Sequence, residues 1–170
     1  MADAVTSQTL ADGDRTAVMK FTNISDGNGE ASVVKVDVSA LNSNSHTGAA
    51  CSRVHITQVW YAISGMRIDL EWAADTNVKA LILGGGVALE PTNGHFDYRS
   101  FGGLKNTEAS GVSGDVALTT LHHTNNDAYT IVLECAVKVS TSTFFTDASP
   151  EPSEIFVNFT TAVLSPSDNV

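Results

Sequence analysis

The stretch VHITQVWYAISGMRIDLEW, residues 54–72, decides the fold class that we predict for this chain. From residue 66 onward it alternates strictly between apolar and charged side chains, which is typical of a β-strand with one buried face. Its first half is rich in β-branched and aromatic residues, which suit a half-buried sheet. Ser64 and Gly65 lie between the halves, and glycine supplies the positive φ of a tight reversal. We therefore predict a β-hairpin that carries both Trp60 and Trp72 into the core.

Further strand-like segments with turn signals between them occupy most of the remaining chain. The predicted strands are Val5 to Leu10, Arg15 to Ile24, Ala31 to Val38, Val78 to Leu83, a short one around His95 to Arg99, Asp115 to His122 and Ala128 to Val139. The first three predict a meander, and the last two predict a second hairpin. No helix signal is convincing. The sequence thus predicts an all-β fold, an antiparallel β-sandwich or barrel-like single domain over residues 1–139.

The composition changes after Val139, where a segment rich in Ser and Thr with two prolines precedes a strand-like run, Ile155 to Leu164. We interpret residues 140–170 as an extended arm with a terminal strand. That strand either returns to its own sheet or is donated to a neighbouring subunit, because an unpaired sheet edge accepts any strand that fits. The pattern leaves both alternatives open.

Composition limits the classes of function. The chain has 170 residues, of which 42% are hydrophobic and 16% charged, with a formal net charge of −10. That length suits one domain with a sizeable core. An acidic chain repels phosphate backbones, so we expect no nucleic-acid partner. Because no apolar run approaches a membrane span and no signal peptide is visible, we expect no membrane partner and folding in a cytoplasm, with Cys51 and Cys135 reduced and buried.

No pattern of reactive residues indicates a chemical site. The five histidines are scattered, and the adjacent His122 and His123 would face opposite sides of a strand, so they would not share a metal ion. The segment that starts at Asp26 resembles the first half of a calcium loop but has Ala31 where such a loop needs glycine. Gly84 to Gly86 lacks the lysine and helix of a phosphate-binding loop. We expect no catalytic, cofactor or metal site.

Four segments together resemble a known group of proteins: VTSQTLADGDRTAVMKFTNISDGNGE from residue 5, FGGLKN from residue 101, SGDVALTT from residue 113 and YTIVLE from residue 129. They look like parts of small β-rich structural proteins of tailed bacteriophage virions. The resemblance implies a virion component made in the cytoplasm of an infected bacterium. Within that group we favour a capsid decoration, or cement, protein. Such proteins lie on the outside of the head and bridge major capsid subunits, often as homotrimers.

An interface is the functional site that this resemblance implies, with the major capsid protein and other copies of this chain as partners. Aromatic residues dominate the binding energy of protein interfaces. The candidate interface residues all lie in the arm: Phe144, Phe145, Ile155 and Phe156.

Three other functions remain as alternatives. One is a ring component of the virion neck or tail, which would use two different contact surfaces. Another is a carbohydrate-binding β-sandwich, in which Trp60, Trp72 and Tyr129 would line a sugar platform, although on alternating strands they are more often core residues. The last is an enzyme whose site is assembled only in space.

Overall fold

The computed structural model describes residues 4–84, 90–107 and 110–139. The predicted arm, residues 140–170, lies outside the described residues, and so do its four candidate interface residues, Phe144, Phe145, Ile155 and Phe156. The arm and the domain boundary at residue 139 therefore stay predictions.

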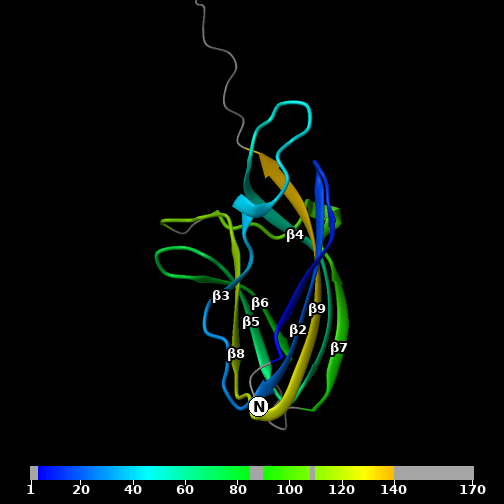
Figure 1. Ribbon diagram of the computed structural model, residues 1–170, viewed down its shortest axis with the longest axis vertical. Helices are drawn as coiled ribbons and strands as arrows, with labels where there is room; N and C mark the ends of the chain where they lie inside the picture. Colours follow the sequence, from blue (N-terminus) through cyan, green and yellow to red (C-terminus); the bar gives the residue numbers. More distant parts are fainter. Residues whose placement is uncertain (1–3, 85–89, 108–109, 140–170) are drawn as a thin grey trace, which may run out of the picture. The chain divides into compact units, whose positions relative to one another are not determined.

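The described residues form nine strands and two short 3-10 turns, which confirms the predicted all-β class (Figure 1). The strands are β1 (Thr6–Asp12), β2 (Thr16–Asp26), β3 (Val33–Val36), β4 (Cys51–Ser64), β5 (Arg67–Trp72), β6 (Val78–Gly84), β7 (Thr92–Asp97), β8 (Val116–Leu121) and β9 (Asn125–Val139). The turns are η1 (Val38–Ala40) and η2 (Arg99–Phe101).

The strands make two antiparallel sheets that form a sandwich. The five-stranded sheet has the order β1-β2-β9-β4-β7, and the four-stranded sheet has the order β3-β8-β5-β6. Figure 1 shows β2, β9, β4 and β7 in one layer and β3, β8, β5 and β6 in the other. The long strand β9 lies in the middle of the larger sheet, where it pairs with β2 on one side and β4 on the other.

The predicted hairpin at residues 54–72 is wrong in its pairing. Its two strands exist as β4 and β5, but β4 pairs with β7 and β9, whereas β5 pairs with β6 and β8. The turn through Gly65, which has the predicted positive φ of 80°, therefore crosses from one sheet to the other. The alternation of apolar and polar residues along a strand indicates which side chains are buried. This pattern is the same whether the turn after the strand leads to a neighbouring strand of the same sheet or to the opposite sheet. We call such a crossing turn an arch.

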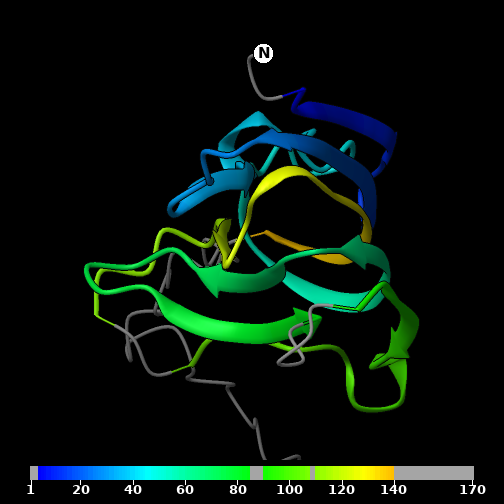
Figure 2. The same cartoon turned by 90° about the horizontal axis from the view of Figure 1, so that it is seen from below.

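The second predicted hairpin is also an arch, because β8 belongs to the four-stranded sheet and β9 to the five-stranded one. The predicted meander is correct only for its first pair, β1 and β2, whose pairing is also visible from below (Figure 2). Strand β3 crosses to the other sheet and pairs with β8. Three pairing predictions thus failed for the same reason, since local patterns do not identify the strand that lies alongside.

The core lies between the inward faces of the two sheets. Its largest fully buried side chains include Phe21, Ile131 and Leu133 from the larger sheet, and Ile68, Leu70 and Leu118 from the smaller one. Trp72 is buried as predicted, but Trp60 is 37% exposed, so only one tryptophan belongs to the core. Both faces of β4 carry apolar residues around position 60, and the sequence therefore did not reveal which face is inward.

The two thiols lie where the sequence placed them. Cys51 and Cys135 are both buried, and no disulfide joins them. Burial raises the pKa of the Cys135 thiol to about 12, with a further contribution from the Glu134 carboxylate.

A buried ion pair lies inside the sandwich. Lys35 Nζ donates to the carboxylate of Glu30, and the hydroxyl of Tyr129 donates to the other oxygen of the same carboxylate. The Glu30 amide donates to Thr120 Oγ1 at 2.8 Å. Because Tyr129 lies on β9 and Lys35 on β3, this group links the two sheets with polar bonds where water is excluded.

Candidate functional site

Outside the buried core, every aromatic side chain of the described residues lies on β4, on β7 or in the segment that ends with η2. Four of them make a continuous row of rings, which we call the aromatic edge: Tyr61, Phe96, Tyr98 and Phe101. Ring centroids are 5.7 Å apart between Tyr61 and Phe96, 5.9 Å between Phe96 and Tyr98, and 5.8 Å between Tyr98 and Phe101. These separations are typical of aromatic pairs in contact.

A glycine on β7 makes room for the first ring of the aromatic edge. Tyr61 pairs with Gly94 in the ladder between β4 and β7. A β-carbon at Gly94 would lie 2.8 Å from the Tyr61 hydroxyl oxygen, so the ring occupies the space that a larger residue would need. The Tyr61 ring therefore crosses β7 and stacks on Phe96.

The chain after β7 folds back on the sheet and leaves the ring of Phe101 exposed. The Tyr98 amide donates to the Thr57 carbonyl at 2.8 Å, and the turn η2 follows. Gly102 and Gly103 both have positive φ, and the Gly103 amide returns to the Tyr98 carbonyl at 2.9 Å. As a result Phe101 is 64% exposed and Phe96 36% exposed, although both are large apolar residues.

An arginine stands beside these rings. Arg99 donates to both oxygens of Asp97, and these hydrogen bonds hold the pKa of Asp97 at about 2. Burial, with a contribution from Tyr61, raises the pKa of Tyr98. Phe96 on the edge strand β7, with Phe101 and Arg99 in the turn η2 that follows, has the composition of energetically important residues at protein interfaces.

The outer face of the smaller sheet carries a separate network of charged residues. Arg67 Nε donates to Asp69 at 2.8 Å, and Lys79 Nζ donates to both Asp69 and Glu71. Burial alone would raise the pKa of Asp69, but the hydrogen bonds from Arg67 and Lys79 outweigh it and the pKa is lowered. Burial would likewise raise the pKa of Glu71, but hydrogen bonds from its donors, of which Asn77 contributes most, outweigh it and the pKa is lowered. Since each carboxylate has its donors within the protein, we interpret this network as structural.

The structure also places the histidines and the three aromatic residues of the alternative sugar platform, which were interpreted first as core residues. His122 follows the end of β8 with a positive φ of 57°, so His122 and His123 are not on a strand. Trp72 and Tyr129 are core residues, and only Trp60 of that platform is exposed. In the described part of the chain, no three His, Cys, Asp or Glu side chains are placed to hold a metal ion together.

The comparisons with known proteins do not add a relative: no family model, curated protein or solved structure matches this chain. None of the helices in the described part is long and apolar enough to cross a membrane.

Sequence reasoning missed the aromatic edge. It placed only the short strand around His95 to Arg99 between Leu83 and Asp115, because glycines and the lack of a sustained period dominate that region. The run HFDYRSF, residues 95–101, does contain a signal, since Phe96 and Tyr98 are two positions apart and share one side of an extended chain. That pair of aromatic residues in a region without other apolar periodicity is the pattern that would have indicated the aromatic edge.

Proposed function

We propose that this chain is a non-enzymatic structural protein of the capsid decoration type, which binds the outside of a phage head and bridges major capsid subunits. The observation that supports this proposal most directly is the aromatic edge, with Arg99 beside it. Two of its rings, Phe96 and Phe101, are exposed, and exposed large apolar residues that lie close together are typical of a protein-binding site. The resemblance of four sequence segments to small virion proteins is the second support.

The mechanism is binding without chemistry. Phe96 and Phe101 insert into apolar pockets of the capsid surface, while the bidentate pair of Arg99 and Asp97 holds the turn that presents Phe101. Because the protein binds the assembled shell and not the separated subunits, binding stabilises the shell by mass action. Truncation of an aromatic residue that is a hot spot of an interface costs about 2 kcal/mol or more of binding free energy.

The test is co-sedimentation of the purified chain with heads assembled from the major capsid protein of the same genome. We expect the double variant Phe96→Ala and Phe101→Ala to bind at least about tenfold more weakly than the native chain. The matched control is Ile82→Ala, since Ile82 is 51% exposed but lies on β6 in the other sheet. If the native chain does not sediment with heads at micromolar concentration, the proposal is wrong.

The proposal includes a homotrimer, and the mass of the protein in solution tests this oligomeric state. One chain has a mass of 17.9 kDa. We expect the full chain to sediment as three copies and a chain that ends at Val139 to lose part of that association, because the arm would contact neighbouring subunits. A full chain that is monomeric both in solution and on heads contradicts the trimer.

A further inference from the structure

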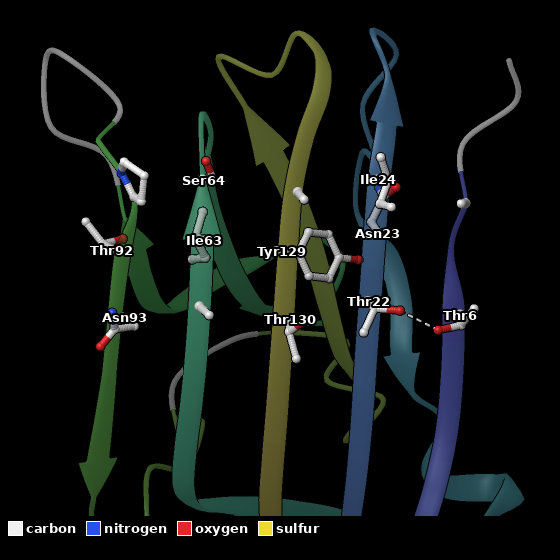
Figure 3. Close-up of a pocket in the computed structure, with 14 residues that line it drawn as sticks. Thr6, Thr22, Asn23, Ile24, Ile63, Ser64, Thr92, Asn93, Tyr129 and Thr130 are labelled. Atoms are coloured by element: carbon white, nitrogen blue, oxygen red, sulfur yellow. Dashed lines mark hydrogen bonds between the residues drawn. The ribbon is translucent and has the colours of Figure 1, made fainter.

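The outer face of the five-stranded sheet carries a shallow groove on the side of β7 opposite to the aromatic edge. Its floor is a row of directly paired residues that crosses all five strands: Thr6, Thr22, Thr130, Ala62 and Asn93. Phe21 and Ile131, one position along their strands, point into the core, so the row points outward. Figure 3 labels Thr6, Thr22, Thr130 and Asn93 of this row, which lie side by side across the sheet.

Small side chains make the floor hollow. The groove has a volume of about 630 Å³ at the end of the sheet that contains Ser64 and Ala128. A second hollow of about 470 Å³ shares Ala62, Asn93 and Thr130 with it and ends at Trp60 and His95. The two hollows therefore adjoin at these three residues, and the rings of Trp60 and His95 line the second one.

The groove is uncharged. None of the residues that line either hollow carries a formal charge, apart from the titratable ring of His95. The whole chain has a net charge of −10, so this uncharged area is a distinct part of an acidic protein. A lining of hydroxyl, amide and apolar groups without ions is complementary to a neutral ligand that carries its own hydroxyl groups.

The wall formed by the rings of Trp60 and His95 is rigid. Trp60 and His95 are direct partners on β4 and β7, and their rings stack with centroids 4.7 Å apart and planes 11° from parallel. Gln58 Nε2 donates to the Glu134 carboxylate at 2.8 Å, which directs the oxygen of the Gln58 amide toward His95 Nε2 at 3.1 Å. Because that oxygen only accepts, Nε2 carries the proton.

The bond to Gln58 fixes which nitrogen of His95 donates. In the neutral form of the ring Nδ1 is then an acceptor, and no partner for it is found among the described residues. Asn93 lies two positions earlier on the same side of β7 and lines both hollows. Thr130 adds a hydroxyl from the floor. A ligand beside Trp60 thus has His95, the Asn93 amide and the Thr130 hydroxyl as polar partners on the outer face of the sheet.

We infer that this groove binds a neutral sugar chain, with the apolar face of one hexose ring against the exposed part of Trp60. Hydroxyl groups of the sugar donate to His95 Nδ1 and pair with the Asn93 amide and the Thr130 hydroxyl. A peptide that adds as a strand has no place here, because the backbone of the three middle strands of the sheet is already paired on both sides. Only Tyr61 of the aromatic edge also lines this groove, and the exposed Phe96 and Phe101 lie outside it, so the inference goes beyond the proposed function.

The experiment is a titration of the full chain with glucose, galactose, mannose and N-acetylglucosamine, and with linear oligosaccharides of each. Tryptophan fluorescence and calorimetry measure the binding. We expect at least one oligosaccharide to bind with a dissociation constant of about 1 mM or lower. Trp60→Ala should weaken that binding about tenfold or more. Thr130→Val, which keeps the shape of the side chain and removes the hydroxyl, should weaken it less.

Two controls separate the possible outcomes. Phe101→Ala, an exposed aromatic residue outside the groove, should leave sugar binding unchanged, and the thermal midpoint of each variant reports whether it folds. Absence of binding by every sugar overturns the inference, and so does binding that Trp60→Ala and Thr130→Val leave intact. A double variant of Phe96 and Phe101 that loses head binding but keeps sugar binding shows that the two surfaces act independently.

Discussion

The carboxylate of Asp127 lies over the Cα of Gly65, where a β-carbon at position 65 would come within 1.8 Å of Asp127 Oδ1. Gly65 lies in the arch from β4 to β5, and Asp127 is the third residue of β9, just after the arch from β8. The first arch therefore contacts the start of β9 at one end of the sandwich. Asp127 also accepts hydrogen bonds from the amide and the hydroxyl of Thr124, which fixes its carboxylate in that position.

This contact predicts that Gly65→Ala destabilises the fold more than Gly48→Ala does. Both glycines have positive φ, which costs an alanine about 1 kcal/mol or more, but nothing lies within 4 Å of the β-carbon position at Gly48. Only at position 65 must Asp127 also leave its bonds to Thr124. Urea unfolding of the two variants measures the difference, and equal losses of unfolding free energy contradict the contact.

The buried group around Glu30 predicts that Tyr129→Phe destabilises the protein by about 1–3 kcal/mol. The change keeps the ring in the core and removes the hydroxyl that donates to Glu30, so a buried carboxylate loses one partner. Tyr61→Phe is the matched control, because the Tyr61 ring stacks on Phe96 and no hydrogen bond of its hydroxyl is found among the described residues. The unfolding free energies of both variants decide the point, and a larger loss for Tyr61→Phe would exclude this role.

The charged network on the smaller sheet predicts how stability depends on pH. The pKa values of Asp69 and Glu71 are lowered in the folded state, so each adds stability that is fully present above its ordinary value, 3.8 or 4.5. That stability is lost as the pH falls through the lowered pKa values of the folded state.

Removal of one cationic side chain from that network should make the protein lose its stability at a higher pH when it is acidified. In Lys79→Gln the carboxylates of Asp69 and Glu71 lose a charged donor, so their folded pKa values rise toward the ordinary ones. Thermal midpoints measured from neutral pH down to about pH 2 compare the variant with the native chain. If the thermal midpoints of the variant and the native chain fall with pH in the same way, Lys79 does not set these pKa values.

The buried thiol predicts resistance to alkylation. Since Cys135 is buried and its pKa is raised to about 12, almost none of it is thiolate near neutral pH, and only the thiolate reacts. Iodoacetamide should label Cys135 in urea but not in the folded protein. Mass spectrometry of peptides that contain Cys135 measures the labelling, and rapid reaction in the native state contradicts the packing.

The sequence predicted the positions of the strands better than their partners. Alternation over residues 66–72 located β5 and its buried face, because burial on one side is a local property of a strand. Pairing across the sandwich is not local. The turn at Gly65 has the same composition whether it closes a hairpin or an arch, and only the strands on either side of β4 decide which one forms.

The surfaces were harder to predict than the strands. Trp60 was expected in the core because both faces of β4 are apolar near it, whereas one face turned out to be the wall of the groove. The groove floor draws its residues from five strands, so no spacing along the chain indicates it. The four interface residues predicted in the arm remain a hypothesis that the truncation at Val139 tests.

The central place of β9 has a consequence for how the protein is made. This strand is the last to leave the ribosome among the nine described, yet it lies between β2 and β4, which are synthesised much earlier. Until residue 139 has emerged, the β1–β2 pair and the β4–β7 pair have no common neighbour and expose the edges that β9 will cover. The larger sheet therefore closes only after synthesis of the domain, which makes folding slow and leaves the nascent chain dependent on protection from aggregation.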